Sequence, residues 1–214
     1  MPRPALSPRF CATYNSCLFL DGGEADSQRL YYSNPLKPDQ YGLNNYLEMS
    51  TRQGGAISGL FTYFNFLIVL RQNCIDVVTG SYPNFTSQTI LENIGSTACN
   101  SIATVPELGV IFATYAGVYL FSGNLEYSDK PQLVKLSEAI SKTWRRVNRD
   151  QLVRATACYS WKAKEYHLYV CADGSNVPNL GLVFHVDRKS WTQRIGFPVG
   201  CLTTDQQGNV IFGH

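Results

Sequence analysis

The feature that most limits the possible folds is a short strand-turn-strand pattern that recurs along the whole chain. Each copy has a short β-favouring run, a turn of polar or small residues, and then a more apolar run. The five copies are Ala12–Leu20, Thr62–Leu70, Val105–Ala113, Ser160–Val170 and Thr203–Phe212. They recur at irregular intervals of roughly 40–60 residues, which is typical of propeller blades built from four short strands.

A further strand-like run follows four of the copies after a turn rich in Gly, Asp or Asn. These runs are Arg29–Asn34, Cys74–Ser81, Gly117–Gly123 and Gly181–Asp187. The stretch Asp187–Trp191 then predicts the turn into an outer strand. We therefore predict an all-β fold, a β-propeller-like array of four to five blades or partial blades. A β-sandwich with evenly spaced hairpins is the alternative.

The predicted array forms a single domain over residues 1–214. The fifth copy is not followed by a partner run, so the domain is expected to be incomplete or open at its C-terminal edge. An uncovered strand edge favours association. We therefore expect contacts between subunits.

One segment departs from the strand pattern and predicts a short inserted helix over about residues 136–147. Leu136, Ile140, Trp144 and Val147 recur with the spacing of one helix face. Ser137 is a candidate for the N-cap of this helix.

Composition limits the possible functions. Hydrophobic residues make up 44% of the 214 residues, enough for a substantial core. Charged residues make up 16% and the net charge is +2, which argues against a protein that mainly binds nucleic acid, although a local DNA contact stays open.

The seven cysteines lack C-x-x-C spacing and are expected to be small buried residues in a reducing compartment. We expect synthesis in a cytoplasm, because neither a secretory signal nor a membrane span is visible.

Residues with catalytic or metal-binding chemistry are few. His167 and His185 lack metal-ligand spacing and fit structural or surface histidines. The loops Asp173–Asn176 and Asp205–Asn209 resemble calcium loops only superficially and fit turns. We therefore expect no enzyme activity, no catalytic residue, no cofactor and no metal.

The most distinctive charged feature surrounds the predicted helix. Six basic residues lie there: Lys135, Lys142, Arg145, Arg146, Arg149 and Arg154. Such a cluster is either a solvated helix face or a docking surface for an acidic partner or DNA phosphate, acting through salt-sensitive attraction. These six residues are the candidate partner or DNA contacts.

Several segments together resemble phage tail proteins. The series RFCATYNSCLFLDG, ISGLFTYFNFLIVLRQNCIDVVTG, GVIFATYAGVYLFSG, LSEAISKTW and GLVFHVDRKSWTQ is similar to the propeller domains of tail tubular or nozzle proteins and of related head-to-tail, packaged-DNA-stabilising proteins. Val78-Thr79-Gly80, Gly117–Gly123 and Ser137–Ile140 follow the order of that family's motifs. The likeness runs from about Arg9 to Gly213.

The resemblance implies a structural component of the virion tail, assembled in the bacterial host cytoplasm. Such proteins form homo-oligomeric rings, commonly sixfold in nozzles, that line or close the DNA exit channel. The implied partners are other tail or portal/adaptor proteins, with genomic DNA passing through and no membrane span. Nozzle proteins are usually much longer, so the resemblance fits a small accessory, adaptor or truncated version.

Two other functions stay open. A propeller-type glycan- or receptor-binding module would use exposed Trp161, Trp191 or tyrosines as stacking platforms. A carbohydrate-active enzyme would need paired carboxylates. The candidates for those are Asp76, Glu92, Glu107 and Glu165.

Overall fold

The computed structural model describes residues 7–24, 26–49, 54–122 and 132–213. The chain divides into two compact units, residues 1–97 and residues 98–214. Paired strands of the described residues are antiparallel throughout, and only short helical pieces interrupt them. The prediction of an all-β fold is confirmed, whereas the single domain over residues 1–214 stays a prediction. No helix within the described residues is both long and apolar enough to cross a membrane.

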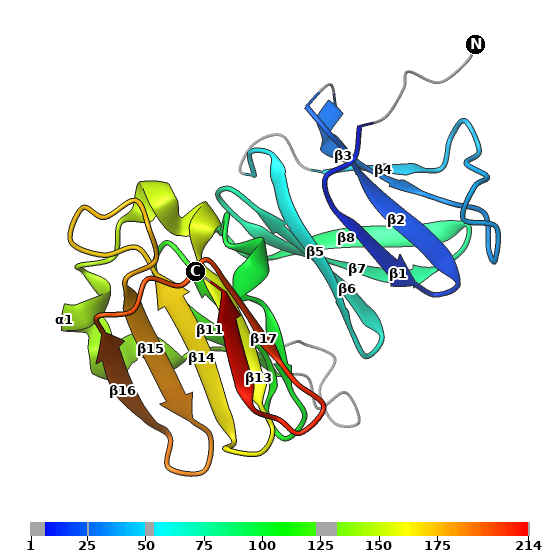
Figure 1. Cartoon of the computed structure of the whole chain (residues 1–214). Coiled ribbons are helices and arrows are strands. Elements are labelled where there is room, and N and C mark those ends of the chain that lie inside the picture. Colours follow the sequence, from blue (N-terminus) through cyan, green and yellow to red (C-terminus); the bar gives the residue numbers. More distant parts are fainter. Residues whose placement is uncertain (1–6, 25, 50–53, 123–131, 214) are drawn as a thin grey trace. The chain divides into compact units, whose positions relative to one another are not determined.

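Two four-stranded sheets form the first unit, each with its strands in chain order (Figure 1). The first sheet contains β1 (Cys11–Tyr14), β2 (Cys17–Gly22), β3 (Asp26–Tyr32) and β4 (Tyr46–Glu48). The second contains β5 (Ile57–Tyr63), β6 (Phe66–Arg71), β7 (Ile75–Ser81) and β8 (Asn84–Leu91). Strand β1 lies beside β5, and the two sheets bury one core that includes Phe19, Leu67 and Phe85.

The second unit contains two further four-stranded sheets and one two-stranded sheet. After the 3-10 turn η1 (Cys99–Ser101), the strands of its first sheet are β9 (Ala103–Val105), β10 (Gly109–Thr114), β11 (Gly117–Ser122) and β12 (Gln132–Lys135). The next sheet contains β13 (Thr156–Ser160), β14 (Glu165–Val170), β15 (Leu180–His185) and β16 (Ser190–Ile195). The last contains β17 (Cys201–Thr204) and β18 (Val210–Gly213).

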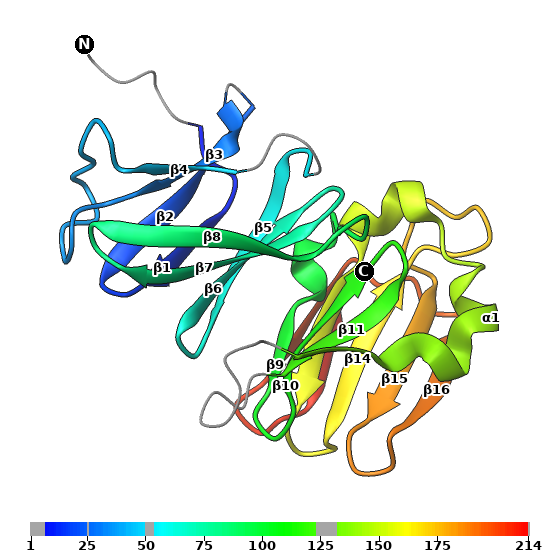
Figure 2. The ribbon, with the colours of Figure 1, turned by 180° about the vertical axis from the view of Figure 1, so that it is seen from behind.

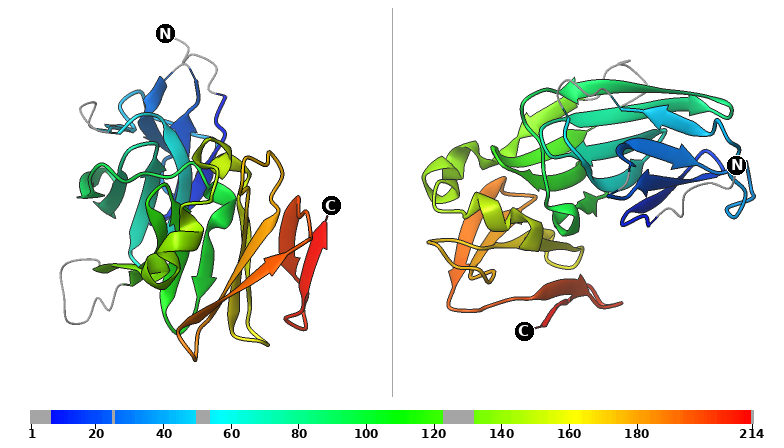
Figure 3. Two further views of the ribbon diagram at one scale, coloured as in Figure 1. Left: turned by 90° about the vertical axis from the view of Figure 1, so that its left-hand side faces the viewer. Right: turned by 90° about the horizontal axis from the view of Figure 1, so that it is seen from above.

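Successive sheets of this unit adjoin at their first strands, since β13 lies beside both β9 and β17. The sheets β9–β12 and β13–β16 lie next to each other (Figure 2), and their side chains form a common core. The β17–β18 hairpin lies on the other side of β13–β16 (Figure 3). Four-stranded meanders that adjoin at their first strands are the arrangement of propeller blades. The prediction of a propeller-like array of blades and partial blades is therefore confirmed.

The hairpin between β10 and β11 shows how the local sequence shapes a blade. Thr114 pairs with Gly117, which leaves a two-residue loop between the strands. Gly117 has a φ of +151°, and a Cβ at this position would clash with Oγ of Ser137. The same Oγ accepts a hydrogen bond of 3.0 Å from the Val118 backbone N–H. Glycine is therefore required here because the next segment of chain packs directly onto the turn.

The helix predicted over residues 136–147 is shorter and broken. Residues Leu136–Ile140 form the 3-10 helix η2, and α1 covers only Ser141–Trp144. The prediction that Ser137 caps the helix is wrong, because its hydroxyl instead bonds to β11 and Lys135 occupies the N-cap position of η2. The apolar face is confirmed. Its members Leu136, Ile140, Trp144 and Val147 all pack against the core of the second unit.

The seven cysteines, all within the described residues, form no disulfide bond with one another. Four of them, Cys17, Cys74, Cys158 and Cys171, are buried as expected. Burial raises the pKa of the Cys158 thiol to about 11, which keeps it uncharged at neutral pH. Cys11 and Cys201 are exposed and differ from the prediction.

Candidate functional site

The sheet β13–β16 has two chemically different faces. Residues alternate across a strand, so Tyr166 and Leu168 of β14 point into the core of the second unit. Glu165 and His167, the alternate residues of the same strand, belong to the opposite face. Cross-strand pairing places His185 of β15 directly opposite Glu165. The face turned away from the core is therefore polar.

A carboxylate surrounded by side-chain nitrogen atoms forms the centre of this polar face. Nε2 of His167 lies 3.0 Å from Oε2 of Glu165, and Nδ1 of His185 lies 3.0 Å from Oε1. A guanidinium nitrogen of Arg194, in β16, lies 3.9 Å from Oε2. His185 also contacts Oγ1 of Thr192 through Nε2 at 3.1 Å. The two histidines approach different oxygens of one carboxylate, so they flank it.

A groove with a volume of about 450 Å³ opens beside these side chains. We call it the β14 groove. It is lined by Ser160, Lys162, Ala163, Glu165, His167, Arg194, Gly208, Asn209 and Val210. These residues come from the end of β13, from the β13–β14 turn, from β14 and β16, and from the β17–β18 hairpin.

Hydrogen bonds fix the hairpin that forms one wall of the groove. The Ser160 hydroxyl donates to the Gly208 carbonyl at 2.6 Å, and Nζ of Lys162 donates to Oδ1 of Asn209 at 2.9 Å. Oδ1 of Asp205 accepts the backbone N–H groups of Gln207 and Asn209, at 2.8 Å each. The loop Asp205–Asn209 is thus held as a turn, as its sequence predicts.

His167 is a deeply buried polar side chain at the groove. Its side chain is 3% exposed, and neither ring nitrogen has a hydrogen-bond partner among the described residues. The 3.0 Å contact between Nε2 and the Glu165 carboxylate is close but poorly aligned for a hydrogen bond. Burial lowers the pKa of His167, with the Arg194 charge acting in the same direction and Glu165 opposing both. The described residues therefore hold a buried, neutral imidazole next to the Glu165 carboxylate.

This lowered pKa predicts a pH-dependent stability. Below the ordinary histidine pKa of 6.5 the unfolded chain binds a proton that folded His167 resists, so the free energy of unfolding falls as pH falls through that value. We expect His167→Gln to flatten the curve between about pH 7.5 and pH 5. Denaturant unfolding of both proteins across this range measures the difference. Parallel curves would contradict the assignment.

The two tryptophans expected as stacking platforms differ in their surroundings. Trp161, in the β13–β14 turn, is 56% exposed. Trp191 packs against Phe184 with ring centroids 5.0 Å apart, and its Nε1 donates to the Leu136 carbonyl at 3.0 Å. Trp161 is therefore available to a ligand, whereas Trp191 has a structural role.

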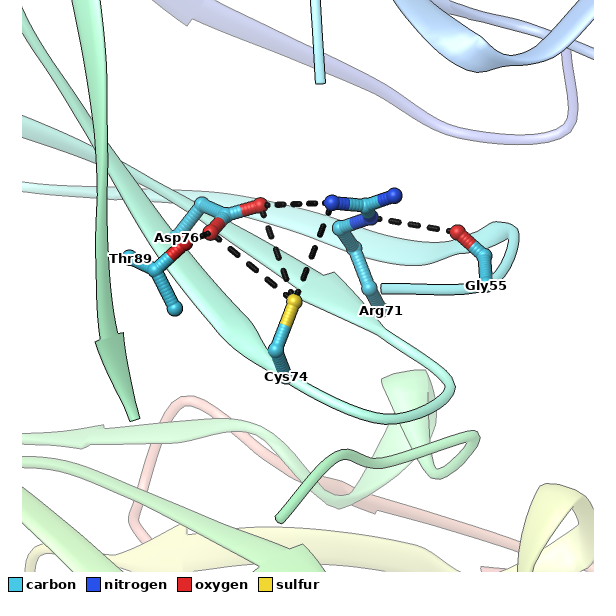
Figure 4. Close-up of polar contacts among 5 residues, drawn as sticks. All are labelled: Gly55, Arg71, Cys74, Asp76 and Thr89. Carbon is cyan, nitrogen blue, oxygen red and sulfur yellow. Dashed lines mark hydrogen bonds and ion pairs between the residues drawn. The ribbon is translucent and has the colours of Figure 1, made fainter. Parts of the chain in front are cut away.

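The candidate carboxylates have separate roles. In the first unit, Asp76 is buried and accepts from Nη1 of Arg71 at 3.3 Å and from the Thr89 hydroxyl at 2.6 Å (Figure 4). The buried Asp76 side chain is thus a structural group. Glu92 is exposed. In the second unit, Glu107 lies 3.6 Å from Nζ of Lys164 and is not among the residues that line the β14 groove. Glu165 alone among the four lines this groove.

The six basic residues of the predicted contact cluster are not equivalent. Lys135 pairs with Glu138 at 3.2 Å. Arg146 forms two bonds of 2.6 and 3.0 Å with Asp173, which raise the pKa of the arginine and lower that of the aspartate. The other four, Lys142, Arg145, Arg149 and Arg154, are exposed on α1, on the chain after it, and on the 3-10 helix η3 (Arg149–Arg154). Their role as partner or DNA contacts stays a prediction.

The sequence did not indicate the cluster around Glu165. Glu165 and His167 are two residues apart, which places them on one face of a strand. That spacing is the local sequence pattern from which the pairing of these two side chains could have been predicted. The approach of His185 and Arg194 depends on the pairing of β14, β15 and β16. Within the described residues no group of three or more His, Cys, Asp or Glu side chains is placed to hold a metal ion.

Comparisons with known proteins concern the fold. No family model and no curated protein sequence matches the chain. The extracellular domain of a one-component system protein from B. thetaiotaomicron is similar, with a TM-score of 0.57 and 13% identity over 99% of this chain and 27% of that chain. A structure described as a hybrid two-component system extracellular domain, from the same organism, gives 0.55 and 14% over the same shares. For Hsv2 of Kluyveromyces lactis the TM-score is 0.48 and the identity 15%, over 86% of this chain and 49% of that one.

The chain thus spans 27% to 49% of the length of these three structures. At such low identity the likeness shows the fold alone. Fold and blade topology together define the chain as a propeller-like module.

Proposed function

We propose that this module is a structural component of a phage virion tail. It serves as a nozzle, tubular or head-to-tail adaptor ring that assembles as a homo-oligomer around the DNA exit channel. It acts without catalysis, by presenting rigid blades to neighbouring tail or portal/adaptor proteins. The ring would surround genomic DNA during ejection.

The observation that carries this proposal is the position of the family-like motifs in the blades. Val78-Thr79-Gly80 lies in β7, and the Gly117 motif begins β11, although its last residue, Gly123, is outside the described residues. Ser137, in the third motif, bonds to the Gly117 hairpin. Because each motif shapes a strand or a blade junction, a framework role is supported better than a catalytic one.

A pair of exposed aromatic rings supports contact between subunits. Phe197, which follows β16, and Phe212, in β18, are 55% and 56% exposed. Their ring centroids lie 6.4 Å apart. Exposed aromatic side chains that cluster are typical of protein interfaces. In this proposal a second copy of the chain covers the two rings.

The proposal predicts that the purified protein forms a defined oligomer and that the chain is present in purified phage particles. Light scattering and electron microscopy measure the first property, and mass spectrometry of particles measures the second. Phe212→Lys is expected to weaken association about tenfold or more, because it buries a charge in the contact.

Val177→Lys is the matched control, since Val177 is an exposed apolar residue outside the ring pair. It should leave the oligomer unchanged. A protein that stays monomeric at high concentration and is absent from particles would rule out the proposed function.

A further inference from the structure

The β14 groove has an aromatic platform at its edge. Trp161 is half exposed, and a Cβ on Gly208 would come within 2.7 Å of its indole ring. Gly208 in turn lines the groove. The close packing on the backbone holds the indole in place beside the cavity. A fixed aromatic surface next to converging polar groups is typical of small-molecule sites.

The interior of the groove offers both donors and acceptors. Glu165, 17% exposed, presents carboxylate oxygens, and the ammonium group of Lys162, which donates one hydrogen bond to Asn209, presents N–H donors. A ligand hydroxyl can donate to the carboxylate and accept from the ammonium group, whereas an apolar molecule can do neither. The interior therefore suits a molecule that carries hydroxyl groups.

Two cations at the groove add a preference for negative charge. The Arg194 side chain is 49% exposed and only 3.9 Å from Glu165, and Lys162 donates one hydrogen bond to Asn209. A guanidinium binds a planar carboxylate through two parallel bonds. The Glu165 charge disfavours a doubly charged group such as a phosphate monoester. A single carboxylate on the ligand fits this balance.

We propose that the β14 groove binds an acidic sugar residue of the hexuronic acid type. The sugar ring stacks on Trp161, its carboxylate pairs with Arg194, and its hydroxyls donate to Glu165 and accept from Lys162. A volume of about 450 Å³ lies within the usual range for small-molecule sites. This site is independent of the proposed tail role.

Calorimetric titration of the full chain with sodium glucuronate and sodium galacturonate tests the proposal. We expect saturable binding of at least one of them with a dissociation constant below about 10 mM. Methyl glucoside, which lacks the carboxylate, should bind at least about tenfold more weakly, and inorganic phosphate should not compete.

Two substitutions identify the groove as the site. Trp161→Ala and Arg194→Gln should each weaken binding about tenfold or more, while Lys189→Gln, an exposed cation on the same sheet's β15–β16 turn, should not. Near-ultraviolet circular dichroism verifies that each variant is folded, and a misfolded Trp161→Ala is replaced by Trp161→Ser. No binding of either uronate, equal binding of the neutral sugar, competition by phosphate, or unchanged binding in both groove variants would overturn the proposal.

Discussion

Replacing Asp76 by alanine is expected to lower the free energy of unfolding of the first unit by about 3–5 kcal/mol. The Arg71 side chain is fully buried, and Asp76 supplies its charge partner at 3.3 Å. Nε of Arg71 donates to the Gly55 carbonyl at 3.1 Å, and a Cβ on Gly54 would clash with the guanidinium. The described residues thus hold the guanidinium against the backbone of Gly54 and Gly55, away from water. Loss of the carboxylate therefore leaves a buried positive charge without a partner.

Hydrogen exchange in β6 and β7, together with denaturant unfolding, measures this effect. Glu48→Gln is the matched control, because the Arg29–Glu48 pair is at the surface, with Glu48 65% exposed, and should change stability by about 0–1 kcal/mol. The double variant Arg71→Met with Asp76→Leu removes both charges and should be more stable than Asp76→Ala. A loss below about 1 kcal/mol in Asp76→Ala would show that water reaches the guanidinium.

The same pair shows why the sequence predicted the blades better than the polar groups within them. Strand and turn positions depend on neighbouring residues, and the hairpin from Thr114 to Gly117 could be located from its apolar runs and its glycine. The role of Asp76 depends on which side chain lies across the sheet. In the sequence Asp76 was therefore one of several candidate carboxylates, and nothing indicated that its side chain is paired and buried.

The β14 groove could not be predicted from the sequence, for a similar reason. Glu165 and His185 are far apart in the sequence, and only the register of β14 with β15 brings them together. Arg146 likewise belongs to a basic run in the sequence, yet it pairs with Asp173, 27 residues further on. Charge clustering along a sequence therefore overstates the free charge at a surface whenever a distant loop supplies the counter-ion.

The broken helix illustrates a third limit. The spacing of Leu136, Ile140, Trp144 and Val147 correctly gave the buried face, because burial follows the periodicity of apolar residues. The helix length did not follow from that spacing. Ser137 bonds to β11, and Val147 forms an isolated bridge with Ala172, so one end of the segment is tied to a strand and the other to the chain just after β14.

Trp144→Ala is expected to destabilise the second unit by about 3–5 kcal/mol. Trp144 is 5% exposed and ends a helix of four residues, too short to be stable by itself. The buried indole is the largest side chain through which this segment contacts the core. Its removal leaves a cavity and frees η2 and α1 from the sheets, so their amide protons should exchange first, followed by those of β10 and β11.

Lys142→Ala separates packing from helix propensity in this segment. Lys142 is exposed on α1, and alanine favours helix at least as well as lysine, so stability should stay within about 0.5 kcal/mol. Lys142 is also one of the four basic side chains that have no ion pair among the described residues. The same variant therefore measures the contribution of Lys142 to binding an acidic partner or DNA. If Trp144→Ala were as mild as Lys142→Ala, the segment would be held by the Arg146–Asp173 pair and the Val118–Ser137 bond. The buried face inferred from periodicity would then contribute little to the stability of the blade.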